Sequence, residues 1–336
     1  MKKLIKIILI NIIFVIGFSG CGYLILTVDN VGDSLFDNTK KVENKEENPV
    51  KNNVKMSALW AGHSSVFVQL YDKTLIFDPF FNDHLGGIFS RKVEAGIDLD
   101  KITKLDLICI SHSHMDHLCF SSIGDLTGKF PDSKLLFPYG LEYYLPPFNV
   151  EMIRVDNRQV SKNNFGKPEI VDNIKVTPVF AAHTGGRYGL DTYTWLVEGA
   201  TGYILEYKDL CIYFAGDTGY DSVAFKNIGN NFKIDLAFIP IGPCGHCDST
   251  GNKYHTSSLE ALELFKDIKA KRMIPIHYGA VKYSRDENYP LYVMEDLLKT
   301  SKYSYLNNNI YILKIGEQII FNDKTSESTG TKNQTK

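Results

Sequence analysis

The chain has 336 residues, with 37 Lys or Arg and 39 Asp or Glu, so its formal net charge is −2. Hydrophobic residues make up 44% and charged residues 23%, which excludes a disordered chain and a polytopic membrane protein. Nucleic-acid binding normally requires a basic excess, so no nucleic acid is expected as a partner. Six cysteines are too few for a disulfide scaffold.

The N-terminal residues 1–28 are more apolar than the chain as a whole. Lys2, Lys3 and Lys6 precede an uncharged, mostly apolar run over residues 7–28. A helix of this length would measure about 33 Å and could cross a hydrocarbon core of about 30 Å. Because basic residues stay on the cytoplasmic side, the rest of the chain is expected outside the cytoplasm.

Two interpretations of this segment remain open. One is an uncleaved transmembrane helix, and the other is a lipoprotein signal in which the small residues Ser19 and Gly20 precede a lipidated Cys21. Both predict a membrane-anchored protein whose remaining residues lie extracytoplasmically, at the cell surface or in the periplasm. A cleaved secretory signal fits less well, because Cys21 lies within the run and apolar residues continue after it.

Residues 29–55 are rich in Asn, Lys and Glu and poor in apolar residues, which predicts a flexible linker. Residues 322–336 have the same character and are expected to form a flexible tail. Between them, residues 56–321 contain no second linker and are expected to form one domain.

Inside that domain, short β-rich runs alternate with turns. The expected strands cover residues 65–70, 74–77, 105–110, 174–180, 193–198, 203–206, 210–214, 236–241 and 271–276. The clearest helix covers residues 257–270 and begins with Ser257 and Glu260 in a capping-box pattern. Many strands and few helices indicate packed sheets with helices outside.

The strand over residues 105–110 runs directly into a dense group of metal-binding side chains. His112, His114, Asp116 and His117 fall within six residues. Imidazole nitrogens and carboxylate oxygens suit Zn²⁺, and protonated histidines at this density would repel one another. The motif therefore predicts a metal centre. On an extended turn, His112 and His114 would point one way and Asp116 and His117 another, so that one loop could begin two metal sites.

This motif resembles the signature of the metallo-β-lactamase fold superfamily. Three later residues, each after an expected strand, match the remaining ligand positions in order, namely His183, Asp217 and His277. The resemblance implies an α/β fold in the form of a four-layer αβ/βα sandwich. It assigns one metal to His112, His114 and His183 and the other to Asp116, His117 and His277, with Asp217 bridging.

Such a site implies two Zn²⁺ per chain, with Mn²⁺ or Fe as alternatives. Two dications about 3.5–4 Å apart would share a water and convert it to a hydroxide nucleophile near neutral pH. Histidine at position 114 favours hydrolysis, because a carboxylate there would favour an iron redox pair.

Four segments resemble the N-acylphosphatidylethanolamine-hydrolysing phospholipase D branch of the superfamily, and they lie at residues 59–65, 77–80, 216–220 and 236–242. The resemblance involves residues from about 58 to 284. It implies a phosphodiesterase of phospholipase D type acting on a phospholipid or another small anionic ester. A lactonase or β-lactamase-like hydrolase, and a non-catalytic metal- or lipid-binding surface protein, are the alternatives.

Further side chains are expected around the metals. Asp116 and His255 are candidate catalytic residues, and His255 would bind phosphate or protonate the leaving oxygen, unless it is only a loop histidine. His63 and Asp78 are expected to support metal-binding residues from behind. An aspartate before Pro79 can equally cap a turn.

Substrate contacts are expected from Arg187, Tyr188 and Tyr278. Arg187 lies on a glycine-rich turn after His183 and could pair with a phosphate, although a solvated arginine fits equally. Cys244 and Cys247 are separated by two residues in a glycine-rich loop. A local disulfide is expected there rather than a redox-active motif, which normally begins a helix.

Overall fold

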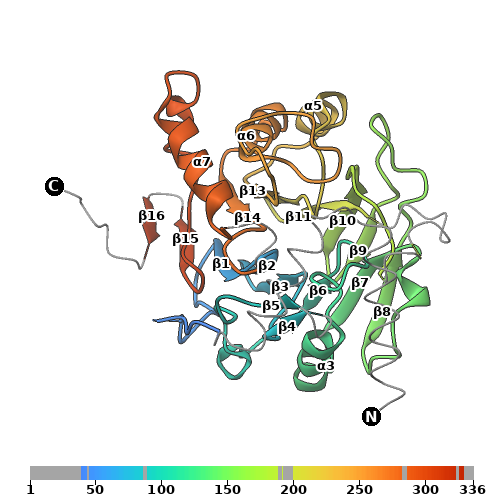
Figure 1. Cartoon of the computed structure of the whole chain (residues 1–336). Helices are drawn as coiled ribbons and strands as arrows, with labels where there is room; N and C mark the ends of the chain where they lie inside the picture. The colour runs from blue at the N-terminus through green and yellow to red at the C-terminus, as the bar shows by residue number, and fades with distance from the viewer. Residues whose placement is uncertain are drawn as a thin grey trace, which may run out of the picture.

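Two β-sheets form the centre of the fold, and helices cover their outer faces (Figure 1). The computed structural model describes residues 39–43, 45–85, 89–187, 191, 200–281, 286–322 and 325–328. Residues 1–28 and the strand expected at 193–198 lie outside these ranges. In the part of the chain that is described, no helix is both long and apolar enough to cross a membrane.

The first sheet has the strand order β16-β15-β1-β2-β3-β6-β7-β8. Its strands are β1 (Met56–Gly62), β2 (Ser65–Leu70), β3 (Lys73–Phe77), β6 (Leu107–Cys109), β7 (Lys134–Pro138), β8 (Glu151–Val155), β15 (Gln318–Asn322) and β16 (Thr325–Ser328). Neighbours from β16 to β3 are antiparallel, and β3, β6, β7 and β8 are parallel. The carboxyl ends of β3 and β6 therefore meet at one edge of the sheet.

The second sheet has the order β14-β13-β12-β11-β10-β9. Its strands are β9 (Glu169–Val171), β10 (Ile174–Val179), β11 (Gly202–Tyr207), β12 (Leu210–Phe214), β13 (Leu236–Pro240) and β14 (Met273–Ile276). β12, β13 and β14 are parallel, whereas β12 to β9 are antiparallel. β4 (His84–Leu85) and β5 (Phe89–Ser90) form a separate two-stranded sheet.

The described helices are α3 (Phe120–Lys129), α5 (Ser222–Asn231), α6 (Ser258–Asp267) and α7 (Tyr289–Lys299), with 3₁₀ turns at Leu99–Lys101, Leu141–Tyr143 and Ser304–Leu306. α5, α6 and α7 lie together on one side of the molecule and α3 lies on the other (Figure 1). The predicted capping box is confirmed, because Ser257 and Glu260 exchange side chain–backbone hydrogen bonds at the start of α6.

Side chains of the first sheet alternate between two hydrophobic clusters, as the two-residue period of a strand requires. Trp60 and Val68 belong to the large cluster that includes the strands of the second sheet. Leu59 and Phe67 belong to a smaller cluster with Ile123 of α3. The resulting order is helix, sheet, sheet, helices, and it confirms the expectation of two packed sheets.

The described part of the expected linker, 39–43 and 45–55, lies against the domain. Val42 N donates to Glu94 Oε1 at 2.8 Å, Gln318 Nε2 donates to the Pro49 carbonyl at 2.7 Å, and Val54 is buried. These contacts differ from the solvated linker that composition indicates. The composition of a segment indicates how much apolar surface it can bury by itself. Residues 39–43 and 45–55 are instead held by hydrogen bonds to side chains of the folded domain.

A smaller difference occurs at the C-terminal end. β16 lies within the expected flexible tail 322–336, and it pairs with β15 in an antiparallel ladder. Backbone hydrogen bonding at a sheet edge needs no apolar side chains, so composition does not report it.

Candidate metal centre

The metal-binding side chains meet where strands of the two sheets end. Residues 111–117 follow β6, His183 follows β10, Asp217 follows β12 and His277 follows β14. The parallel arrangement brings the ends of β12 and β14 to the same edge, opposite the end of β6. Ligand candidates from distant parts of the chain are thus gathered at one place.

The first cluster consists of His112, His114 and His183. The Nδ1 atom of His114 lies 3.0 Å from Nε2 of His112 and 3.1 Å from Nε2 of His183. All three ring nitrogens lie within 4.8 Å of one another. This is the set of three neutral nitrogens expected for one metal.

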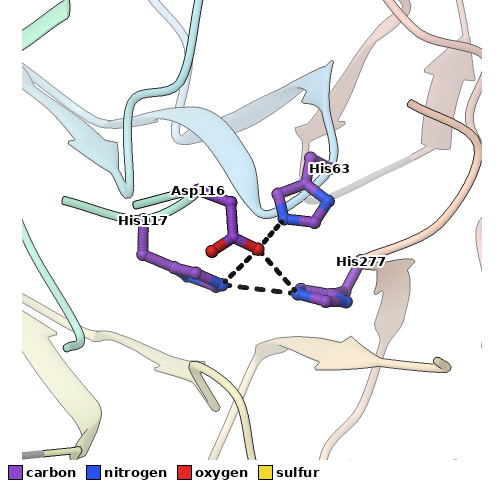
Figure 2. A group of neighbouring side chains, drawn as sticks. All are labelled: His63, Asp116, His117 and His277. Atoms are coloured by element: carbon purple, nitrogen blue, oxygen red, sulfur yellow. Dashed lines mark hydrogen bonds and ion pairs between the residues drawn. The ribbon is translucent and has the colours of Figure 1, made fainter. Parts of the chain in front are cut away.

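The second cluster surrounds the carboxylate of Asp116 (Figure 2). Asp116 Oδ2 lies 2.8 Å from His63 Nε2, 3.6 Å from His117 Nε2 and 3.8 Å from His277 Nε2. The Nε2 atoms of His117 and His277 are 3.3 Å apart. His63, expected only to support this group, thus lies within it and contacts Asp116 directly.

Asp217 lies between the two clusters. Its Oδ2 atom is 3.2 Å from His117 Nε2 and 3.1 Å from His277 Nε2. The same atom is 3.9 Å from Nε2 of both His112 and His183. This position is the one expected of a carboxylate that bridges two metals.

The residues fit a pair of metal ions. Ligand atoms at about 2.05 Å in a tetrahedral arrangement are about 3.3 Å apart. The contacts of His114 with His112 and His183 are 3.0 and 3.1 Å, and those among His117, His277 and Asp217 are 3.1–3.3 Å. None of the described residues forms a hydrogen bond with the buried Oδ1 atom of Asp217. A buried carboxylate oxygen without a donor is costly, and a cation would satisfy it.

The protonation states of the two clusters differ. Burial lowers the pKa of His183 to about 3 and also lowers the pKa of His112 and His114. Burial opposes protonation of His277 too, but Asp217 and Asp116 raise its pKa to about 9. Against the same effect of burial, nearby carboxylates, Asp217 first, also raise the pKa of His117 well above its usual value. At pH 7 the first cluster therefore offers free lone pairs, whereas His117 and His277 of the second hold protons that a cation would displace.

The carboxylates of the second cluster stay ionised. Burial acts to raise the pKa of Asp217, but the neighbouring His117 and His277 hold it well below its usual value. The pKa of Asp116 is held low in the same way, chiefly by His117. A buried carboxylate, Asp217, and a mostly buried one, Asp116, are therefore both ionised, and a bound cation would stabilise them.

Asp78 supports the metal loop, as expected. Its Oδ1 atom accepts a hydrogen bond from Ser111 N at 2.7 Å, and its Oδ2 atom accepts from Ser111 Oγ at 2.6 Å. His117 Nδ1 lies 2.7 Å from the same Oδ2, an arrangement that leaves Nε2 for the metal. The parallel pairing of β3 and β6 produces this contact, because Asp78 directly follows β3 and Ser111 lies two residues after the end of β6.

Two supporting groups were not predicted from the sequence. Ser111 Oγ contacts His112 Nδ1 at 2.9 Å, and the backbone carbonyl of Tyr254 contacts His183 Nδ1 at 2.8 Å. The position of Ser111 directly before the motif was an available signal. A backbone carbonyl carries no signal in the identity of its residue.

His63 owes its position to a tight turn between β1 and β2. Gly62 has a φ of 94°, and a Cβ there would lie 2.8 Å from Nη2 of Arg91, so only glycine fits. The carbonyl of His63 accepts hydrogen bonds from Trp60 Nε1 and from His277 N, each at 2.9 Å. The turn thereby connects the first sheet to the loop that carries His277.

His255 lies at the edge of the centre and keeps 27% of its side-chain surface exposed. Its Nδ1 atom is 3.6 Å from Asp217 Oδ2, and its ring centre is 4.8 Å from that of His183. Burial lowers the pKa of His255 to about 4, so the ring is neutral at pH 7. A neutral ring here can donate a hydrogen bond to a bound molecule more readily than a proton.

Arg187 and Tyr278, two of the three residues expected to contact the substrate, do not lie together at the metal centre. Nη1 of Arg187 donates to the carbonyls of Ser113 and Leu118 at 3.1 and 2.6 Å, and its guanidinium lies over the Phe120 ring. These contacts brace the metal loop, and pairing with a phosphate remains a prediction. Tyr188 lies outside the described residues. The Tyr278 ring lies 4.6 Å from that of Trp60. Both residues line a cavity that none of the candidate metal-binding residues lines.

The expected disulfide joins Cys244 to Cys247, with Cα atoms 5.2 Å apart. It shapes the loop between β13 and α6, which also carries Tyr254 and His255. The loop forms one wall of the metal centre.

Two facing sheets with a His/Asp cluster at their common edge define a metallo-β-lactamase type of fold. A family profile described as the beta-lactamase superfamily domain matches residues 73–278, more than half of the chain. The chain belongs to this family. It is a metal-dependent hydrolase of the metallo-β-lactamase superfamily.

Similarity to individual proteins agrees with this assignment. N-acyl-phosphatidylethanolamine-hydrolyzing phospholipase D 1 of Caenorhabditis elegans is 29% identical over 267 residues, covering 76% of this chain and 72% of the relative. A UPF0173 metal-dependent hydrolase of Saccharolobus solfataricus is 30% identical over 221 residues, covering 66% and 83%. Igni18, a metallo hydrolase of Ignicoccus hospitalis, matches with a TM-score of 0.58 at 20% identity over 80% of this chain and 99% of its own, which concerns the fold alone.

Proposed function

We propose that this protein is a binuclear zinc phosphodiesterase of phospholipase D type that cleaves N-acylphosphatidylethanolamine-like phospholipids. The observation that carries the proposal is the position of Asp217, whose Oδ2 atom lies within 3.9 Å of histidines from both clusters. A purely structural zinc site needs four protein ligands and no carboxylate shared between two clusters. The similarity to the nematode phospholipase D supports the choice of substrate.

Two clusters of ligand atoms would hold the two ions. His112, His114 and His183 would bind one, Asp116, His117 and His277 the other, and Asp217 would contact both. When bound, such ions supply a Lewis acid and a water of lowered pKa, so that no serine or cysteine nucleophile is required. The histidine-rich ligand set favours Zn²⁺, and Mn²⁺ and Fe remain alternatives for the experiment.

The charge of the centre suits an anionic phosphodiester. Two dications would bring four positive charges, and the ionised carboxylates of Asp116 and Asp217 offset two of them. The remaining positive charge would attract the phosphate of the substrate and stabilise the charge that develops during cleavage.

The chain's own residues would orient the substrate and the ligands. His255, neutral at pH 7 and partly exposed beside Asp217, would donate a hydrogen bond to a phosphoryl oxygen. Asp116 would orient the imidazole rings of His63 and His117 through its Oδ2 atom. Arg187 would keep the metal loop in place through two of its carbonyls.

We further propose that residues 1–28 anchor the protein to a membrane with the hydrolase domain outside the cytoplasm. The basic head and the uncharged run over residues 7–28 support this orientation. A phospholipid substrate would then lie in the same membrane as the anchor.

A substrate panel tests the proposed activity. The purified protein is analysed for metal content and assayed with an N-acylated phosphatidylethanolamine, a generic phosphodiester, a lactone and a β-lactam. We expect two metals per chain and turnover of the phosphodiesters. Turnover of only the lactone or the β-lactam would replace the proposal with a lactonase or β-lactamase activity. Full metal content without any turnover would favour a non-catalytic binding protein.

A matched pair of variants tests the bridging carboxylate. Asp217→Asn removes the shared charge and is expected to lower activity about 100-fold or more and to reduce metal content. Asp132→Asn makes the same chemical change at an exposed turn and should leave both unchanged. Equal activity of the two variants would contradict the assignment of Asp217.

A further inference from the structure

The loop between β13 and α6 supplies two groups to the metal centre. The backbone carbonyl of Tyr254 lies 2.8 Å from His183 Nδ1, and the ring of His255 lies beside Asp217. A carbonyl oxygen can only accept a hydrogen bond, so His183 carries its proton on Nδ1 and leaves the lone pair of Nε2 for a metal. The position of this loop therefore decides how well His183 can bind.

One side chain, that of Glu260 in the first turn of α6, holds the loop at both ends. Its Oε1 atom accepts a hydrogen bond from Gly251 N at 2.6 Å, and its Oε2 atom accepts from Ser257 N at 3.0 Å. Asn252 Nδ2 donates to the same Oε2 at 3.4 Å. The carboxylate thus closes residues 251–257, the segment that carries both groups, into a compact loop.

The second of these contacts belongs to the helix cap, and the first does not. A capping box needs only the bond between the glutamate side chain and the backbone of the first cap residue, here Ser257. The bond from Gly251 N is shorter and reaches a residue well before the helix. Glu260 is only 2% exposed, and a carboxylate is buried at low cost only where hydrogen bonds satisfy it. The loop and the carboxylate therefore fix each other.

The loop packs closely on the backbone beside His183. A Cβ at Gly219 would lie 2.3 Å from the carbonyl oxygen of Lys253 and 2.9 Å from that of Asn252. Gly219 N in turn donates to the carbonyl of Ala182, the residue before His183, at 2.9 Å. Release of the loop would therefore also loosen the backbone that carries His183.

We propose that Glu260 is a positioning residue for the metal centre, which acts by holding residues 251–257 so that the Tyr254 carbonyl stays on Nδ1 of His183. Without this carbonyl the His183 ring can carry its proton on either nitrogen, and protonated Nε2 cannot bind a metal. Loss of Glu260 therefore weakens the metal site of the first cluster. The inference rests on the metal centre of the proposed function and not on its substrate.

Two carboxylates of the same helix provide matched variants. Glu260→Ala removes both loop contacts, and Glu260→Gln keeps one acceptor oxygen. Glu263→Ala and Glu263→Gln are the controls, because Glu263 accepts from Tyr303 Oη at 2.6 Å and pairs with Lys266, away from the loop. All four substitutions should lower the free energy of unfolding, and only those of Glu260 should change the metal centre. If Glu260→Ala does not fold, the two glutamine variants provide the same comparison.

Competition between the full-length protein and a chromophoric chelator measures zinc affinity. We expect Glu260→Ala to weaken binding of one of the two zinc ions about three- to tenfold, below the range of about 10–100-fold that a direct supporting contact provides. Glu260→Gln should lie between this variant and the parent, and both Glu263 variants should match the parent. Parent-like affinity of the Glu260 variants, or an equal loss in the Glu263 variants, would overturn the proposal.

A proton signal separates positioning from a general loss of stability. In the zinc-loaded protein labelled with ¹⁵N-histidine, the Nδ1–H proton of His183 should exchange slowly with water, because the Tyr254 carbonyl holds it. Exchange should be at least about tenfold faster in Glu260→Ala and unchanged in Glu263→Ala. Unchanged exchange in both variants would contradict the role of Glu260. Neither measurement uses a substrate, so two bound zinc ions without phosphodiesterase activity would refute the proposed function and leave this role intact.

Discussion

Replacing Asp78 by asparagine tests how the metal loop is held. The carboxylate is fully buried and contacts Ser111 N, Ser111 Oγ and His117 Nδ1 at 2.6–2.7 Å. In Asp78→Asn the amide oxygen can still accept from Ser111 N, but the amide group then faces His117 with a donor. His117 must accept at Nδ1, which moves its ring proton to Nε2, the atom 3.2 Å from Asp217. A protonated Nε2 cannot bind a metal.

The expected loss follows from these contacts. Supporting groups of this kind contribute about 10–100-fold to metal affinity, or about 1.4–2.8 kcal/mol. The altered buried hydrogen bonds should also lower the free energy of unfolding by about 1–3 kcal/mol. Competition with a chromophoric chelator measures the first quantity, and urea denaturation of the metal-free protein measures the second.

Asp106→Asn is the matched control. Asp106 lies at the opposite end of β6, where its Oδ2 atom accepts from Thr74 N at 2.8 Å and from Thr74 Oγ1 at 2.9 Å. The same substitution there should cost stability without changing metal affinity. Parent-like metal binding by Asp78→Asn, or an equal loss of metal affinity in both variants, would contradict this explanation of the loop.

Two further predictions concern protons and the membrane. Because the pKa of His277 is raised to about 9, metal binding at pH 7 should release its proton, and affinity should increase from pH 6 to pH 9. Calorimetry in two buffers of different ionisation heat measures this release, and binding without any proton release at pH 7 would contradict the assignment. Cys21→Ser should abolish lipid labelling and membrane association if the N-terminus is a lipoprotein signal, whereas a transmembrane helix would keep the protein in the membrane fraction. Deletion of residues 7–28 should release it in either case, and its retention would exclude both interpretations.

Much of the fold was predictable because local patterns carry it. The runs at 65–70 and 74–77 match β2 and β3, and the capping box at Ser257 begins α6. Strands without a strong pattern, such as β15 and β8, were not predicted. β15 owes its strand structure to pairing with β1, which is distant in the chain, and β8 pairs with β7 at the edge of the sheet.

The chemistry of the centre follows from the amino-acid sequence alone. His112, His114, Asp116 and His117 occupy one short loop, so their proximity follows from chain connectivity, and imidazole and carboxylate groups already indicate a metal. The order of the later candidates, His183, Asp217 and His277, is likewise evident in the sequence.

The way these groups share the site depends on tertiary contacts. Folding brings His63 to 2.8 Å from Asp116 across the β1–β2 turn and directs Arg187 onto the carbonyls of the metal loop. It also turns Tyr278 into a separate cavity beside the metal centre. The physical reason is that sheet register and side-chain alternation decide which way a side chain points, and both depend on strands far apart in the sequence.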